Sequence, residues 1–90
     1  MKKKTLEIGE LVAMPGAIEA IPNEEIFAAL ERHKNHDWGD IPKDDKESNN
    51  LALIYGERIL SSYKSLEGKK FWIITEADRS STTVLFPEEY

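Results

Sequence analysis

A run of acidic, basic and hydroxyl side chains at residues 76–81 is the part of this chain best equipped for chemistry. The candidate binding residues in this run are Glu76, Asp78, Arg79 and Ser80. Together they offer acid–base groups and donors for anchoring an anion. The chain contains no G-x-S-x-G elbow, phosphate-binding loop or H-E-x-x-H motif, so we predict no catalytic residue. The favoured interpretation is a structured turn, in which Asp78 accepts backbone amides and Arg79 pairs with Glu76 or a helix carboxylate.

A second candidate is the aromatic side chain in the polar sequence Asp37-Trp38-Gly39-Asp40. Trp38 has the type of side chain that anchors protein interfaces, and Asp37 and Asp40 would flank it as binding residues. The alternative, which we favour, is that Trp38 folds back over the edge of the core, because burying an aromatic ring stabilises a small domain by several kcal/mol. Asp40 is then the expected cap of the helix that Pro42 begins.

A metal site would have to use the histidine pair His33 and His36 with Asp37. The cluster spans an expected helix end, which does not hold two imidazoles in a fixed geometry, and short motifs of this kind are weakly specific. We interpret both histidines as surface residues of a charged loop. The chain has no cysteine, which removes thiolate ligands and thiol nucleophiles. We therefore predict neither a metal nor a cofactor.

The charge balance bears on the kind of partner. Twelve lysines and arginines face 17 acidic residues, giving a net charge of −5. This argues against direct nucleic-acid binding, which depends on neutralising phosphates, and favours a protein partner with a basic surface. The more common alternative is an acidic surface that only maintains solubility.

The N-terminal residues 1–5 contain three lysines and are expected to form a mobile basic tail. The segment after this tail is too short and too charged for a signal peptide or a membrane span. Together with the missing cysteines, this leads us to expect a cytoplasmic protein without membrane contact.

Periodicity, proline and glycine define the expected elements of one α+β domain over residues 1–90. They are a strand at 9–13, a helical turn at 15–21, a helix at 24–33 capped by Asn23, a helix at 42–55, and strands at 58–64, 70–76 and 82–86. The last three strands should form an antiparallel meander, because neither connection is long enough for a parallel crossover. The apolar residues expected in the core are Ile26, Phe27 and Leu30 of the first helix and Leu51, Ile54 and Tyr55 of the second.

Several strings in the chain also resemble those of a group of small bacterial proteins that are labelled hypothetical or plasmid-related. The strings are Leu11-Val12-Ala13 with Pro15-Gly16-Ala17, then 37–40, then Trp72 to Ser80, and finally Pro87-Glu88-Glu89-Tyr90. The resemblance spans nearly the whole chain. It implies a mobile-element setting but brings no established activity, so no catalytic residue is carried over.

Three functions remain open from the sequence. The first is a small acidic regulatory protein whose residues 40–47 and 88–89 face a basic groove of a host nucleic-acid-binding or defence protein. The second is a small ribonuclease of the RelE-like toxin type, whose general plan also places helices before an antiparallel meander, but the acidic charge disfavours holding RNA. The third is a structural subunit, a homodimer for example, in which an exposed strand edge pairs with its own copy.

Overall fold

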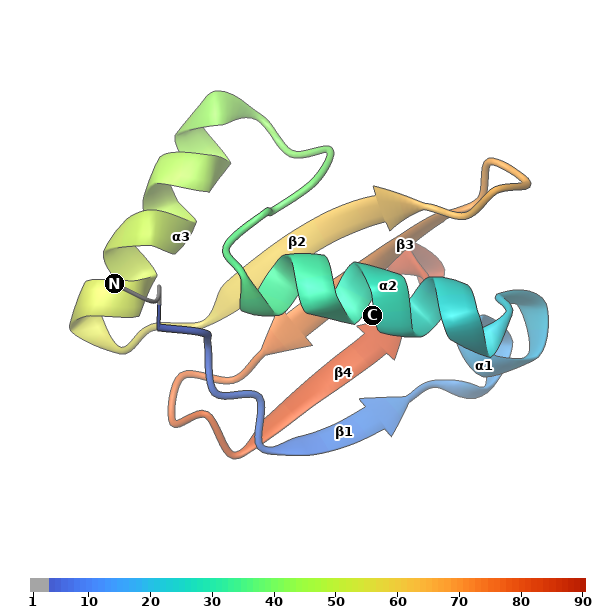
Figure 1. Cartoon of the computed structure of the whole chain (residues 1–90), viewed down its shortest axis with the longest axis horizontal. Coiled ribbons are helices and arrows are strands. Elements are labelled where there is room, and N and C mark those ends of the chain that lie inside the picture. The colour runs from blue at the N-terminus through green and yellow to red at the C-terminus, as the bar shows by residue number, and fades with distance from the viewer. Residues whose placement is uncertain (1–3) are drawn as a thin grey trace.

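The computed structural model of the chain describes residues 4–90. Its elements are β1 (Glu10–Ala13), α1 (Pro15–Ala20), α2 (Asn23–Lys34), α3 (Lys43–Tyr55), β2 (Ile59–Lys64), β3 (Lys70–Thr75), β4 (Ser81–Leu85) and the 3-10 turn η1 (Pro87–Glu89) (Figure 1). The predicted α+β class, N-terminal strand, two helices and antiparallel meander are confirmed, to within one residue at each end of an element. The predicted mobile tail falls partly on residues 1–3, which lie outside the described residues.

The four strands form one mixed sheet in the order β1-β4-β3-β2. Strands β2, β3 and β4 are the expected meander, with Ser61 opposite Ile73 and Ile73 opposite Val84. Strand β1 adds a parallel pair that the meander did not include, with Glu10 opposite Ser81 on β4. Parallel pairing needs a long connection, and here everything from α1 to β3 lies between the two strands.

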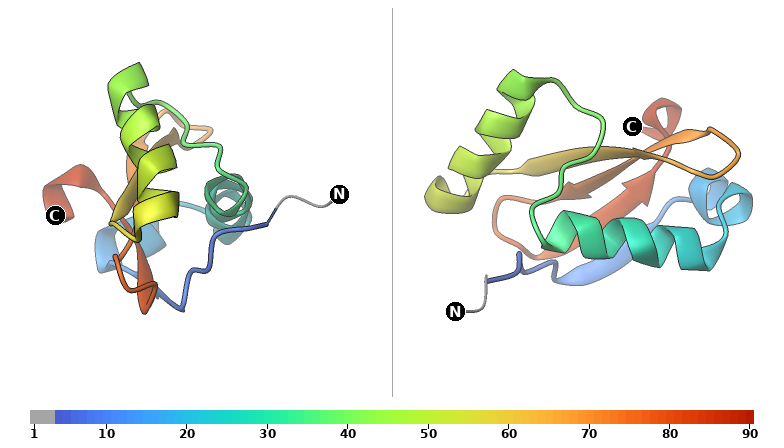
Figure 2. Two further views of the ribbon diagram at one scale, coloured as in Figure 1. Left: turned by 90° about the vertical axis from the view of Figure 1, so that its left-hand side faces the viewer. Right: turned by 45° about the horizontal axis from the view of Figure 1, so that its top comes forward.

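The core lies between the sheet and α2, which crosses one face of the sheet (Figure 1). Ile26 and Leu30 of α2 belong to one buried cluster with Phe71, Ile73 and Val84 of the sheet. Each such side chain contributes about 1.5–3 kcal/mol on burial. The turn η1 lies on the side of the sheet away from α2 (Figure 2).

Both long helices begin directly after a proline, which corrects two predicted caps. Asn23 is the first residue of α2, and Asp40 lies before Pro42 and outside α3; neither helix has a side-chain cap hydrogen bond. Pro22 and Pro42 occupy the cap position with extended backbone, at ψ 143° and 156°. A proline ring fixes the φ that this position needs, and the carbonyl of each proline accepts a helical hydrogen bond.

The buried stripe of α2 differs from the predicted one by one position. Phe27 is 57% exposed, so its assignment to the core was wrong. The buried residues of the helix are Ile26, Ala29, Leu30 and His33. These positions follow the i, i+3, i+4, i+7 spacing of one helical face, and Phe27 lies to the side of it. His33 is fully buried, which also corrects its assignment to the surface.

Helix α3 packs beside the sheet at the edge strand β2, and this explains a second correction. Exposure is high for the apolar residues that the sequence placed in the core, at 51% for Leu51, 73% for Ile54 and 72% for Tyr55. The helix instead buries Asn49 and Ala52. The Asn49 side chain donates to the carbonyl oxygen of Leu60 at 2.7 Å and accepts from its N–H at 3.3 Å. Helix α3 is thus attached through an amide to the backbone of β2.

Trp38 lies in a second, smaller hydrophobic cluster beside the main core. It is 3% exposed and packs with Leu6, Ala52 and Ile59. The interpretation that the ring folds back over the edge of the core is therefore confirmed. The cluster joins the N-terminal segment, the loop before α3, α3 itself and β2.

The segment after Trp38 covers part of the outer edge of β2. The N–H of Ser62 donates to the Trp38 carbonyl oxygen at 3.1 Å, and the N–H of Asp40 donates to the Ser62 carbonyl oxygen at 2.7 Å. Gly39, between them, has φ 73°, and a Cβ at this position would lie 2.0 Å from the Ser62 oxygen. Only glycine allows the two backbones to approach this closely.

Candidate functional site

Residues 76–81 form the tight turn between β3 and β4, as the favoured interpretation held. The turn closes through Arg79 N–H to the Glu76 carbonyl at 2.9 Å, and through Glu76 N–H to the Ser81 carbonyl at 3.0 Å. The Asp78 carboxylate accepts the N–H of Ser80 at 2.9 Å. Hydrogen bonds from the Ser80 hydroxyl and amide lower the pKa of Asp78. The acidic group in the turn therefore caps its own backbone.

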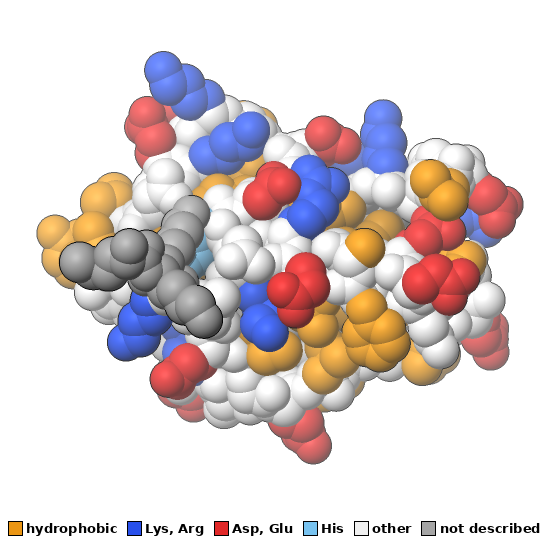
Figure 3. Space-filling model, in the orientation of Figure 1, with side chains coloured by type: hydrophobic (Ala, Val, Ile, Leu, Met, Phe, Trp, Pro, Cys, Tyr) orange, Lys and Arg blue, Asp and Glu red, His pale blue; other side chains and the backbone are white. Residues whose placement is uncertain are grey.

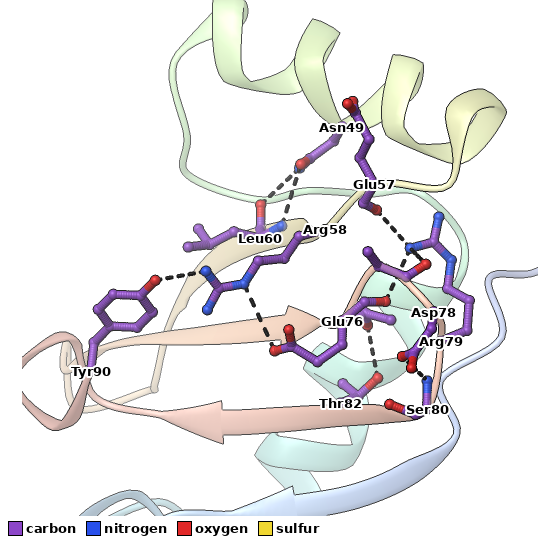
Figure 4. A network of polar contacts seen from close by, with 12 residues as sticks. Asn49, Glu57, Arg58, Leu60, Glu76, Asp78, Arg79, Ser80, Thr82 and Tyr90 are labelled. Atoms are coloured by element: carbon purple, nitrogen blue, oxygen red, sulfur yellow. Dashed lines mark hydrogen bonds and ion pairs between the residues drawn. The ribbon is translucent and has the colours of Figure 1, made fainter.

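Within residues 4–90 Arg79 forms no ion pair with a carboxylate, which corrects that part of the prediction. Its Nη1 donates to the carbonyl oxygens of Glu57 at 2.6 Å, Glu76 at 3.2 Å and Ala77 at 3.3 Å (Figure 4). Its Nη2 donates to the carbonyl oxygen of Ala52, in the last turn of α3, at 3.0 Å. The Ala52 carbonyl also accepts the N–H groups of Gly56 at 2.9 Å and Glu57 at 3.1 Å, and the C-terminal end of a helix carries partial negative charge. Arg79 thus joins the turn to the C-terminal end of α3.

A second arginine, Arg58, lies on the other side of the same turn. Its Nη1 donates to the Tyr90 hydroxyl at 2.7 Å, and its guanidinium carbon lies 5.1 Å from the Tyr90 ring centroid. Its Nε lies 3.8 Å from the Glu76 carboxylate (Figure 4). The Tyr90 ring in turn meets Trp72 edge-on, with centroids 6.0 Å apart. Sequence reasoning did not single out Arg58 or Tyr90, because nothing local connects residues 58 and 90.

Asp37 pairs with a side chain of α2, and Trp38 lies in the interior of the fold. Arg32 donates to the Asp37 carboxylate through Nε at 2.8 Å and Nη2 at 3.2 Å. This pairing lowers the pKa of Asp37 and raises that of Arg32. The Trp38 indole N–H donates to the Asn50 side chain at 3.0 Å. The ring that could have anchored a partner is thus covered in this structure.

The two predicted groups of site residues meet at α3. Ala52 packs its side chain in the Trp38 cluster, and its carbonyl accepts Arg79. One helical residue therefore links the loop at 37–40 to the turn at 76–81. The Glu76 carboxylate lies beside Arg58 and that of Asp78 accepts the Ser80 N–H, so the structure does not gather these two acids into one acid–base pair.

His33 lies at the centre of a buried chain of hydrogen bonds. Its Nδ1 contacts the Ser61 hydroxyl, and its Nε2 lies 2.8 Å from the Thr75 hydroxyl. The Thr75 hydroxyl lies 2.8 Å from that of Thr82, which donates to the Ile8 carbonyl at 2.7 Å. Because each hydroxyl has one proton, Thr75 donates to Thr82 and accepts from His33 Nε2–H. Nδ1 is then the unprotonated nitrogen and accepts the Ser61 hydroxyl.

This arrangement keeps the His33 imidazole neutral. Burial, with a smaller effect of the charge on His36, lowers the pKa of His33 to about 4. Protonation at Nδ1 would also turn the acceptor of the Ser61 hydroxyl into a competing donor. A serine beside a histidine is the basic unit of nucleophilic catalysis, but both residues are fully buried. The pair organises the core.

Among residues 4–90, no group of three His, Cys, Asp or Glu side chains is arranged to hold a metal ion. Over the same residues, none of the helices has the length and apolar character needed to cross a membrane. No protein-family model, curated protein or solved structure matches this chain. The resemblance to plasmid-related bacterial proteins thus stays a prediction.

The apolar side of α3 is the feature of this region most available to a partner. Leu51, Ile54 and Tyr55 are separated by three and four residues, so they lie on one side of the helix, and each is at least half exposed. The first turn of the same helix carries Asp44 and Asp45. Figure 3 shows hydrophobic side chains gathered over the outer side of α3.

Proposed function

We propose that this chain is a non-enzymatic interaction protein that binds a basic protein surface through the exposed side of α3. The supporting observation is the exposure of Leu51, Ile54 and Tyr55 on a helix that is held by Asn49 and Ala52 instead. An apolar centre with a charged rim is the usual anatomy of a protein interface. A mobile-element setting and a host target remain predictions from the resemblance.

The net charge of residues 40–55 supports a partner with basic residues, because the acids there outnumber the two lysines, Lys43 and Lys46. The acidic residues in the first half of the helix and in the segment before it are exposed. They are Asp40, Asp44, Asp45 and Glu47. Acidic groups around an apolar patch speed association with a basic surface and disfavour acidic partners. The net charge of −5 acts in the same direction.

The groups best suited to catalysis are committed to internal contacts, which favours binding over an enzymatic role. His33 is enclosed by hydroxyls, Arg79 donates to backbone carbonyls, and Asp78 caps its own turn. A ribonuclease would need basic groups to hold and polarise RNA. An RNA-cleavage assay with purified protein tests this alternative directly.

The main experiment compares captured proteins between variants in nuclease-treated lysate of the native host. Leu51→Ser/Ile54→Ser removes the apolar side of α3, and Leu66→Ser is the matched control, because Leu66 is exposed at the β2–β3 hairpin. All three substitutions are at the surface, where stability changes stay within about 0.5 kcal/mol. We expect a partner that binds wild type and the Leu66 control but not the double variant. Equal capture by all three proteins would refute the proposal.

A second candidate function, self-association, is favoured by the free edge of β1. Strand β1 ends the sheet, and the N–H groups of Glu10 and Met14 point inward to Ser80 and Val84. Because these groups alternate in direction, those of Leu11 and Ala13 point outward, where another strand can pair. Figure 3 also shows hydrophobic side chains gathered between α2 and β1.

Sedimentation equilibrium over a range of protein concentrations tests the dimer. If β1 pairs with its copy, Leu11→Lys should abolish the dimer, because a lysine on an edge strand disfavours pairing between chains. Leu66→Lys, a lysine of equal charge on the distant hairpin, should leave it intact. A monomer at every concentration would exclude this candidate.

A further inference from the structure

A cleft of about 420 Å³ opens between the N-terminal segment, the loop after α2, the end of α3 and the turn after β3. Its lining residues are Lys4, Thr5, Leu6, Glu7, His36, Leu53 and Arg79. We propose that this cleft binds a small molecule bearing a phosphate or carboxylate group. The volume is within the range of about 300–1,000 Å³ usual for small-molecule sites, and Leu51, Ile54 and Tyr55 are not among the lining residues.

The charge of the lining residues indicates an oxyanion. Lys4, His36 and Arg79 come from three separate segments and converge on one cleft, in a chain whose net charge is −5. Glu7 is the carboxylate among the lining residues. Two permanent cations and an imidazole therefore face one anion. A ligand with one or two negative charges complements this set.

Arg79 is held in place and still has N–H groups to offer. Among residues 4–90 no carboxylate forms an ion pair with it, and its hydrogen bonds to carbonyls use Nη1 and Nη2. A guanidinium has five N–H donors. The Nε–H and one Nη2–H have no acceptor among the described residues. A rigid cation with unused donors is the form of arginine that binds oxyanions well.

Backbone conformation gives an independent indication for the same cleft. Among residues 4–90, His36 at φ 68° and Arg79 at φ 62° are the two non-glycine residues with positive φ, and both line this cleft. Such conformations cost of order 1–3 kcal/mol and tend to cluster at ligand sites. The His36 ring is also fixed by stacking on Trp38, with centroids 5.6 Å apart.

The N-terminal wall of the cleft is fixed to the rest of the fold. Leu6 is buried, and its N–H donates to the Lys34 carbonyl at 2.9 Å. Gly9 brings the chain so close to the turn that a Cβ there would lie 2.4 Å from the Arg79 carbonyl oxygen. Lys4 thus emerges from an anchored segment next to the cleft. Leu6 and Leu53 provide apolar contacts for the body of the ligand.

The test is a titration of the ¹⁵N-labelled protein near pH 6.5 at constant ionic strength. One arm uses inorganic phosphate and pyrophosphate, and the other uses succinate and citrate, to distinguish phosphate from carboxylate ligands. We expect saturable amide shifts at residues 5–7, 36–38 and 78–80, with a dissociation constant of about 1 mM or tighter in at least one arm. Shifts that do not saturate in either arm would overturn the proposal.

Variants separate a built site from general electrostatics. Lys4→Gln removes one cation, and His36→Asn removes the imidazole while keeping a residue type that tolerates positive φ. Each should weaken binding about tenfold, the equivalent of 1.4 kcal/mol. Lys43→Gln, the same charge change at the start of α3, should leave affinity unchanged. Equal weakening by the Lys43 control, or unchanged binding in both cleft variants with intact spectra, would refute the site.

Discussion

Acidification should destabilise this protein through a single buried imidazole. The pKa of His33 is about 4 in the folded chain, against an ordinary value of 6.5. The unfolded chain therefore binds the proton more tightly than the folded one between these values. The contribution of His33 to stability is complete above pH 6.5, is lost as the pH falls from 6.5 to 4, and is constant below.

The size of this loss of stability follows from the two pKa values of His33. Linkage gives a loss on the order of 2 kcal/mol between pH 7 and pH 5, and of about 3 kcal/mol once the pH is below 4. This is a large fraction of the 5–15 kcal/mol typical of small domains. Hydrogen bonds lower the pKa of Asp37 and Asp78 from 3.8. The contribution of these carboxylates to the stability of the fold is therefore lost only at lower pH. Between pH 6.5 and 4.5 the effect of His33 is therefore expected to exceed that of these two carboxylates.

Urea unfolding at several pH values between 7 and 4.5 measures this effect. Wild type should lose stability along the predicted curve. His33→Gln should be less stable at pH 7, because its amide cannot reproduce both ring contacts, but should show little slope over the same interval. His36→Asn should retain most of the slope. A wild-type stability that is flat over this interval, or a His33 ring proton titrating near pH 6.5 by NMR, would refute the reasoning.

Other predictions concern packing and the turn, each checked by urea denaturation. Phe27→Ala should cost less than about 1 kcal/mol, while Leu30→Ala should cost about 2–5 kcal/mol, because only the second side chain is buried. Gly39→Ala should destabilise by several kcal/mol from its clash with backbone, whereas Gly56→Ala, with open space and φ 70°, should cost only about 1–2 kcal/mol. Arg79→Lys should cost about 1–3 kcal/mol and speed amide exchange at residues 76–81, because lysine cannot bridge the four carbonyls. Equal losses of stability in the Phe27 and Leu30 variants, or in the Gly39 and Gly56 variants, would contradict these assignments. Unchanged amide exchange at residues 76–81 in the Arg79 variant would do the same.

The element boundaries could be read from the sequence because their causes are local. Pro22 and Pro42 directly precede the two long helices, and Gly56, in the left-handed conformation at φ 70°, ends one. The face that each helix buries could not be predicted as well from the sequence. Phe27 was expected to be buried and is exposed, whereas His33 was expected at the surface and is buried. The sheet, not the composition of the helix, decides which stripe of α2 is covered.

The candidate site was predictable where a side chain acts on its own turn and not where it acts at a distance. Asp78 caps its neighbours as expected of an aspartate in a turn. Arg79 also reaches the carbonyl oxygens of Ala52 and Glu57 at the end of α3, and backbone groups leave no trace in residue types. The contact of Arg58 with Tyr90 depends on the position of η1 on the side of the sheet away from α2. That position is a property of the whole fold.

The parallel pairing of β1 with β4 has a consequence for how the chain folds during synthesis. Strands β2 to β4 are neighbours in sequence, so their meander can form soon after they leave the ribosome. Glu10 cannot pair with Ser81 until Ser81 has been synthesised. This delays the pairing by about 4–14 s at ordinary translation rates of 5–20 residues per second. During that time Leu11 and Val12 have no strand to pair with. Strand β1 can therefore join the sheet only after β4 has formed. Completion of the sheet depends on a contact of high sequence separation, and such contacts slow folding.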